Sequence, residues 1–69
     1  FISKLKNEFP ELTENELHLS SLLRLKLNTK EIASIKNISP DSVKVMRYRL
    51  RKKFKLDRNV NLIEFLQAY

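Results

Sequence analysis

The amino-acid sequence predicts an all-α fold, and two observations support this prediction. Glycine is absent and proline occurs only twice in the 69 residues, whereas an all-β fold usually needs more turn residues. The apolar residues recur instead at intervals of three and four, which places them on one face of successive helices. We therefore expect a small domain built from four helices.

The first of these helices is expected over residues 14–25. Thr13 and Glu16 form a capping box, in which the Thr hydroxyl accepts a backbone N–H and the Glu side chain reaches back to the start of the helix. Residues 3–8 are compatible with a short additional helix at the N-terminus. It would end before Pro10, because the residue preceding a proline avoids helical angles.

Two further helices begin with the same kind of signal. Asn28 followed by Glu31 predicts a helix over residues 29–36. Ser39 followed by a proline at the first helical position predicts a longer helix over residues 40–54. Only about two residues connect these helices, and so tight a turn makes them cross steeply, as in a helix-turn-helix.

A last helix is expected over residues 60–68, and both Asn59 and Asn61 qualify as its N-cap. Apolar spacing then predicts which side of each helix is buried. The predicted buried residues are Leu19, Leu22 and Leu23, then Ile32, Ala33 and Ile35, then Val43, Met46, Leu50 and Phe54, and finally Leu62, Phe65, Leu66 and Tyr69.

Length and composition exclude several classes of protein. Sixty-nine residues form one small domain with a modest core. There is no cysteine and no cluster of His, Asp and Glu at metal-ligand spacing, so we expect no disulfide, metal ion or other cofactor. No apolar run approaches the roughly 18 residues of a membrane span, and no signal peptide is present. We expect a cytoplasmic domain that binds neither membranes nor small-molecule ligands.

Positive charge is concentrated in one part of the chain. Residues 29–58 carry ten basic and three acidic side chains, whereas residues 1–28 are balanced. Six of the nine residues between Arg47 and Lys55 are basic, and none is acidic. A solvated charged helix face is the alternative explanation, but no acid four residues away on the helix neutralises these cations. A basic half joined to a neutral half points a charged face at a polyanion such as DNA.

The helix over residues 40–54 presents two kinds of surface. If its apolar residues face inward, the opposite side carries Asp41, Lys44, Val45, Tyr48, Arg51 and Lys52, with Arg47 and Arg49 beside them. The mixed N-terminal part suits the reading of base edges, with Lys44 as a donor to guanine and Val45 against a thymine methyl. The cationic C-terminal part suits phosphates. We therefore predict sequence-specific binding of double-stranded DNA, with this helix in the major groove.

The chain from Leu12 to about Leu66 resembles the LuxR-type, also called GerE-type, helix-turn-helix domain of bacterial transcription regulators. The residues that carry the resemblance are Leu12, Thr13 and Glu16, then Lys30 to Ala33, then Ile38, Ser39 and Ser42 to Val45, and finally Lys52, Lys53 and Phe54. The resemblance implies four helices, the third for recognition and the last for dimerisation. Residues 1–11 form an N-terminal extension of a single domain over residues 1–69.

The resemblance also implies roles for individual residues. Lys44, Val45 and Tyr48 are expected to contact bases. Together with the charge pattern, it predicts that phosphates are contacted by Lys30, Ser42, Arg47, Arg49, Arg51, Lys52 and Lys53. Val60 and Ile63 lie off the main apolar stripe of the last helix and are expected to form a homodimer contact on DNA. Contact with RNA polymerase is compatible with such a regulator.

The sequence departs from the family at three helix ends, where glycine is usual and Lys26, Asn37 and Lys55 stand instead. Such ends often need a positive φ, which Asn tolerates, so we expect it at Asn37. The two lysines either carry strain or use another turn. The chain starts with Phe1 rather than Met, and we expect it to be the C-terminal effector part of a longer regulator.

Rival functions are a sigma-factor promoter-recognition domain, whose helix-turn-helix has a similar pattern, and a basic module that docks on proteins or acidic membranes. An enzyme is not expected. The single histidine, His18, lies on the exposed side of its helix with no nucleophile or acid placed beside it.

Overall fold

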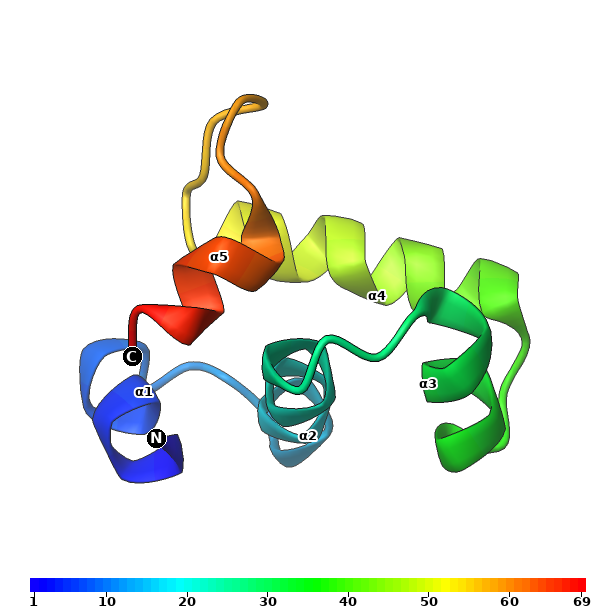
Figure 1. The fold of residues 1–69 in the computed structure, drawn as a ribbon. Coiled ribbons are helices and arrows are strands. Elements are labelled where there is room, and N and C mark those ends of the chain that lie inside the picture. Colours follow the sequence, from blue (N-terminus) through cyan, green and yellow to red (C-terminus); the bar gives the residue numbers. More distant parts are fainter.

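The computed structural model describes residues 1–69 as five helices without strands. They are α1 (Ile2–Glu8), α2 (Glu14–Arg24), α3 (Thr29–Lys36), α4 (Pro40–Lys53) and α5 (Leu62–Gln67). The all-α prediction is confirmed, and the expected helix boundaries agree within two residues. α4 crosses the whole molecule, α3 packs against it, and α2 packs against α5 (Figure 1).

The expected helix starts are present. The Thr13 hydroxyl accepts from the Glu16 N–H at 3.2 Å, and the Glu16 carboxylate accepts from the Thr13 N–H at 2.8 Å. Asn28 forms the same reciprocal pair at the start of α3. The Ser39 hydroxyl accepts from a backbone N–H in the first turn of α4. Asn61 caps α5. The caps of α2, α3 and α4 join residues three positions apart, so local sequence is enough to predict them. For α5 the structure selects Asn61 over Asn59.

Three helices end in the same left-handed turn. The non-glycine residues at positive φ are Lys26 at 64°, Asn37 at 57° and Lys55 at 55°. In each case the following N–H reaches the carbonyl five residues earlier, which is a Schellman motif. These bonds run from Leu27 to Leu22, from Ile38 to Ala33 and from Leu56 to Arg51. The expectation for Asn37 is confirmed, and both lysines adopt the geometry that normally favours glycine.

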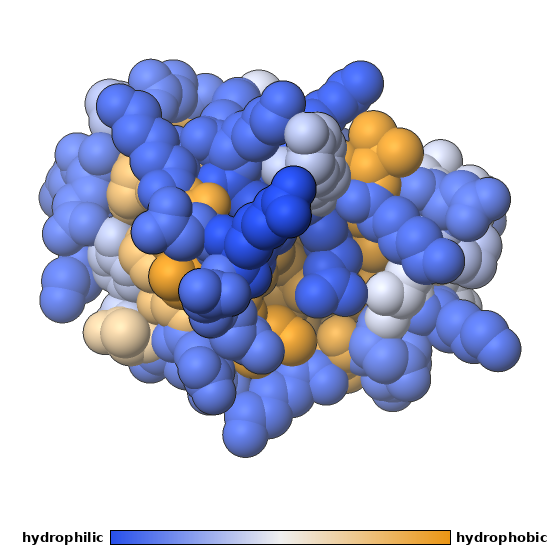
Figure 2. All heavy atoms as spheres, turned by 90° about the horizontal axis from the view of Figure 1, so that it is seen from above, coloured by the Kyte–Doolittle hydropathy of each residue, from blue (hydrophilic) through white to orange (hydrophobic).

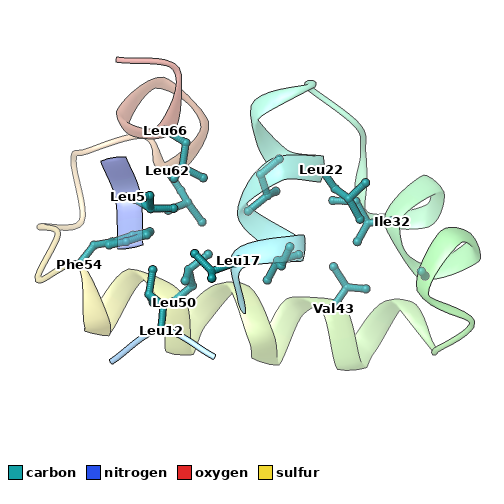
Figure 3. Close-up of a cluster of buried hydrophobic side chains, with 13 residues drawn as sticks. Leu5, Leu12, Leu17, Leu22, Ile32, Val43, Leu50, Phe54, Leu62 and Leu66 are labelled. Carbon is teal, nitrogen blue, oxygen red and sulfur yellow. The ribbon is translucent and has the colours of Figure 1, made fainter. Parts of the chain in front are cut away.

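The core runs along the inner side of α4 (Figure 3). At one end Leu22, Ile32 and Val43 join α2, α3 and the start of α4. At the other end α1, α5 and the end of α4 meet through Leu5, Phe54, Leu62 and Leu66. Leu12, Leu17 and Leu50 lie between these two groups. One continuous apolar cluster therefore fixes the position of α4 relative to the other helices.

Four predicted core residues differ from expectation. Ile35 is 53% exposed, and Met46, Phe65 and Tyr69 are only partly buried. α3 has little more than two turns, and its inward side is occupied by Ile32 and Ala33. Ile35 lies at the edge of that inward side, away from Ala33, and remains exposed, so the prediction that it is buried is wrong.

The N-terminal extension contributes to the same core. Leu5 of α1 is completely buried. Phe9 packs edge-on against Phe54, with ring centroids 4.8 Å apart. The Tyr69 hydroxyl donates to the Glu8 carboxylate, so both chain termini lie at the α1 end of the molecule (Figure 1). Burial raises the pKa of Tyr69 to about 12, and the hydrogen bond to Glu8 and the negative charge of Glu8 act in the same direction.

Candidate nucleic-acid interface

The outer face of α4 is exposed where base contacts were predicted. Lys44 is exposed, Val45 is 48% exposed and Tyr48 is 59% exposed. Their exposure follows from helical spacing, because Val43 and Leu50 point into the core and turn the opposite side outward. Lys52 lies one turn beyond Tyr48, with its ammonium 4.7 Å from the centre of the Tyr48 ring.

Most of the surface around α4 is hydrophilic. Figure 2 views the molecule from the side on which α4 and the α4–α5 loop lie in Figure 1, and that face is predominantly hydrophilic with smaller hydrophobic areas between the long side chains. Lys30, Ser42 and Arg49 are exposed like Lys52. The Ser42 hydroxyl lies 3.0 Å from the Ser39 hydroxyl at the start of α4.

Lys53 is paired within the fold. Its ammonium donates to the Glu16 carboxylate of α2 at 2.7 Å, and this is the only ion pair in the structure. Burial alone would raise the pKa of Glu16, but hydrogen bonds from Lys53 and Thr13 and the charge of Lys53 lower it overall. The partner is 37 residues away in sequence, so a search for acids four residues away could not find it. The interpretation that this cationic stretch is unneutralised is wrong for Lys53.

Arg51 is also engaged within the fold. Its Nη2 donates to the carbonyl oxygen of Asp57 at 2.6 Å, and its Nη1 donates to that of Val60 at 2.7 Å. Both acceptors belong to the loop between α4 and α5. Arg51 therefore ties this loop to the side of α4.

A hollow of about 330 Å³ opens between α4 and this loop. Its lining includes Arg47, Arg51 and Arg58, with Asn59, Val60, Asn61, Leu62 and Ile63. Arg47 also donates to the Thr29 hydroxyl at 3.2 Å. Sequence reasoning missed Arg58, which belongs to the basic segment but lies outside the helix to which the charge was assigned.

The two residues predicted for dimerisation lie beside these arginines. Val60 is 38% exposed, and Ile63 is partly buried against the core cluster. Both line the arginine-containing hollow. The structure thus brings the candidate dimer residues next to the C-terminal part of α4.

A second hollow of about 440 Å³ lies on the opposite flank of α4, between α2 and α3. Its polar lining is organised by Lys36, which donates to the Asn15 side chain at 2.5 Å and lies 3.2 Å from His18 Nδ1. Burial lowers the pKa of Lys36. Ile35, Ile38 and Met46 supply the apolar part of this lining.

The helices and the acidic and histidine side chains set two limits. No helix has the length and apolar character that crossing a membrane requires. No three His, Cys, Asp or Glu side chains lie together where they could hold a metal ion.

Comparison with protein families gives one match. The family model GerE, described as bacterial regulatory proteins of the luxR family, matches residues 11–66. The matched segment contains α2, α3, α4 and nearly all of α5, and it leaves α1 outside. No curated protein and no solved structure matches the chain.

Proposed function

The chain belongs to the luxR family of bacterial regulatory proteins, a family of DNA-binding transcription regulators, and on that basis we propose that it binds double-stranded DNA sequence-specifically with α4 in the major groove. The observation that carries this proposal is the surface of α4. Its inner side is buried against the other helices. Its outer side carries acidic, basic, apolar and aromatic residues near the N-terminus and mainly basic residues near the C-terminus. The family match favours this function over a sigma-factor domain or a protein-docking module.

Base reading is assigned to the first half of α4. The Lys44 ammonium donates to the O6 and N7 acceptors of guanine, and the Val45 methyl groups contact the methyl of a thymine. The Tyr48 hydroxyl both donates and accepts, so it can pair with several base edges. All three side chains are exposed on the outer part of α4, which supports their entry into the groove together.

Phosphate binding is assigned to the residues around this reading face. The proposed set is Lys30, Ser42, Arg47, Arg49, Arg51, Lys52 and Lys53. Lys53 is ion-paired with Glu16, and Arg51 uses two of its N–H groups on loop carbonyls, so we assign these two a supporting role. Arg47 uses only one N–H group on Thr29, and we assign the direct contacts to it and to the other four residues. Each phosphate neutralised by a Lys or Arg adds about −0.9 to the slope of log affinity against log salt, so the four cations among these five residues predict a slope of about −3.6 per domain.

We propose that two copies bind adjacent half-sites and touch through Val60 and Ile63. The exposed apolar area of these two residues is too small for a stable dimer without DNA, because stable interfaces bury about 1,200 Å² or more. Cooperative dimerisation on DNA, contact with RNA polymerase and a cytoplasmic location are parts of the same proposal.

Selection of bound duplexes from a random pool supplies the site for the test. Lys44→Ala and Lys52→Ala are then measured on the selected duplex and on a scrambled duplex at one salt concentration. Lys44→Ala should lose about 1–3 kcal/mol on the selected site, about 5- to 150-fold in affinity. Its loss on scrambled DNA should be smaller, because the phosphate contacts remain. Lys52→Ala should weaken both by similar factors.

Lys6→Ala, a charge removed from α1, is the matched control and should have little effect on either duplex. Equal weakening of both duplexes by Lys44→Ala would show that α4 does not dock as proposed. A salt response that is flat for the unchanged protein would remove DNA binding altogether.

A further inference from the structure

The hollow between α4 and the α4–α5 loop gathers three guanidinium groups. Arg47, Arg51 and Arg58 all line it, and none of them forms an ion pair, since the only ion pair in the structure joins Lys53 and Glu16. A guanidinium cannot lose its proton at ordinary pH. A concave surface with three such charges raises the local concentration of anions.

The loop itself is a defined turn rather than an irregular excursion. The Val60 N–H donates to the Asp57 carbonyl at 3.1 Å, which makes Asp57 to Val60 a β-turn with Arg58 and Asn59 at its centre. Arg51 donates to the carbonyl oxygens at both ends of this turn. Because the planar guanidinium donates to two carbonyls at once, it fixes both the orientation of the turn and its distance from α4. Arg51 thereby determines where the turn presents Arg58.

Arg47 approaches the hollow from the helix side. Its bond to the Thr29 hydroxyl holds it near the start of α3 and uses only one of its five N–H groups. It lies one turn beyond Lys44 on α4, on the flank of the proposed reading face. The backbone of one DNA strand runs along each flank of a helix seated in the major groove.

We propose that Arg47 and Arg58 hold one phosphate of the DNA backbone in this hollow, and that Arg51 is a positioning residue that fixes the turn without contacting DNA. This inference rests on the proposed DNA binding. It adds Arg58 to the phosphate contacts and gives Arg51 a different task from that of its neighbours on α4.

The test measures affinity for the selected duplex as a function of salt. Arg58→Ala should reduce the magnitude of the salt slope by about 0.9, which corresponds to about fivefold weaker binding near 0.15 M salt. Arg58→Lys keeps the charge and should retain most of the slope. Lys6→Ala, which removes one charge from α1, is the control for net charge and should leave the slope unchanged.

Arg51→Lys separates positioning from direct contact. Lysine keeps the charge but lacks the planar fork that reaches two carbonyls at once, so this variant should lose as much slope as Arg58→Ala. The double variant Arg51→Lys/Arg58→Ala should be no weaker than either single variant, because both changes remove the same contact. Far-UV circular dichroism checks that each variant is folded. Arg58 is exposed, so its replacement should leave the fold and the position of Arg51 unchanged.

Each outcome decides one part of the proposal. If Arg58→Ala behaves like Lys6→Ala, no phosphate occupies the hollow. If Arg51→Lys binds like the unchanged protein, Arg51 does not position the turn. If the unchanged protein shows no salt-dependent DNA binding, the proposed function fails instead, independently of the hollow.

Discussion

Lys26 and Lys55 occupy the left-handed turns that close α2 and α4, and replacing either by glycine should stabilise the domain. Their φ angles are 64° and 55°, where the Cβ of an L-residue is crowded by the following carbonyl oxygen. Both side chains are exposed, so glycine removes the strain without opening a cavity. The backbone hydrogen bonds of the two Schellman turns do not depend on the side chain.

The size of the effect is the difference between two terms. Left-handed geometry costs a non-glycine residue about 1–2 kcal/mol, while glycine loses about 0.4–1 kcal/mol more chain entropy on folding. We expect a net gain of about 0.5–1 kcal/mol for each site, and about twice that for the double variant, since the turns belong to different helices. In a domain of this size that gain raises Tm by about 2–8 °C per site.

Thermal and urea unfolding of the single and double glycine variants measure this gain. Lys26→Ala and Lys55→Ala are the matched controls, because alanine removes the charge and keeps the Cβ. Asn37→Gly is a third control and should change Tm little, since Asn tolerates left-handed geometry.

The protein carries a formal net charge of +6, so loss of any lysine reduces charge repulsion. If the alanine variants gain as much stability as the glycine variants, the gain comes from charge and the argument from backbone strain is wrong. A glycine variant less stable than the unchanged protein would show that these residues are not strained at all.

Three further changes test other parts of the structure. Asn37→Val should lower the free energy of unfolding by at least about 1 kcal/mol in a urea titration, because a β-branched side chain fits left-handed geometry poorly; equal stability would contradict the turn assignment. Ile63→Glu should abolish cooperative occupancy of paired half-sites in a gel-shift titration and spare a single half-site, whereas loss of single-site binding would place Ile63 in the core. Glu16→Gln keeps the capping box but removes the charge that pairs with Lys53, and should cost about 0.5 kcal/mol at neutral pH because the pair is partly exposed to solvent. Because the folded state lowers the pKa of Glu16 below its ordinary 4.5, this contribution is present above that pH and is lost as the pH falls through the lowered value. A pH series of melts should therefore show the unchanged protein approaching the variant in acid, and a constant gap would refute the pairing.

Local sequence predicted the helices because their signals act over a few residues. The boxes at Thr13 and Asn28 join groups three residues apart, and the left-handed residue at Asn37 closes a turn within its own helix end. The residues that make such contacts are close in sequence, so the pattern can be recognised without knowing how the helices pack. The same holds for the outward face of α4, whose residues follow from helical spacing once the apolar stripe is known.

The ambiguity between two caps for α5 was resolved by a longer-range contact. Asn59 lies inside the turn from Asp57 to Val60 that Arg51 anchors, so Asn61 is the first asparagine free to cap the helix. No local rule distinguishes the two asparagines, because both precede apolar residues at suitable spacing.

By itself the sequence determined the all-α class, the position of the four main helices, most of their caps and ends, the concentration of charge on α4 and the family. Only the tertiary structure decided which of those charges are free. It paired Lys53 with Glu16, committed Arg51 to the α4–α5 loop and brought Arg58 beside Arg47. The physical reason is that helical spacing assigns a side chain to a face of its own helix, whereas its partners depend on how the helices cross, which the packing of the whole apolar core decides.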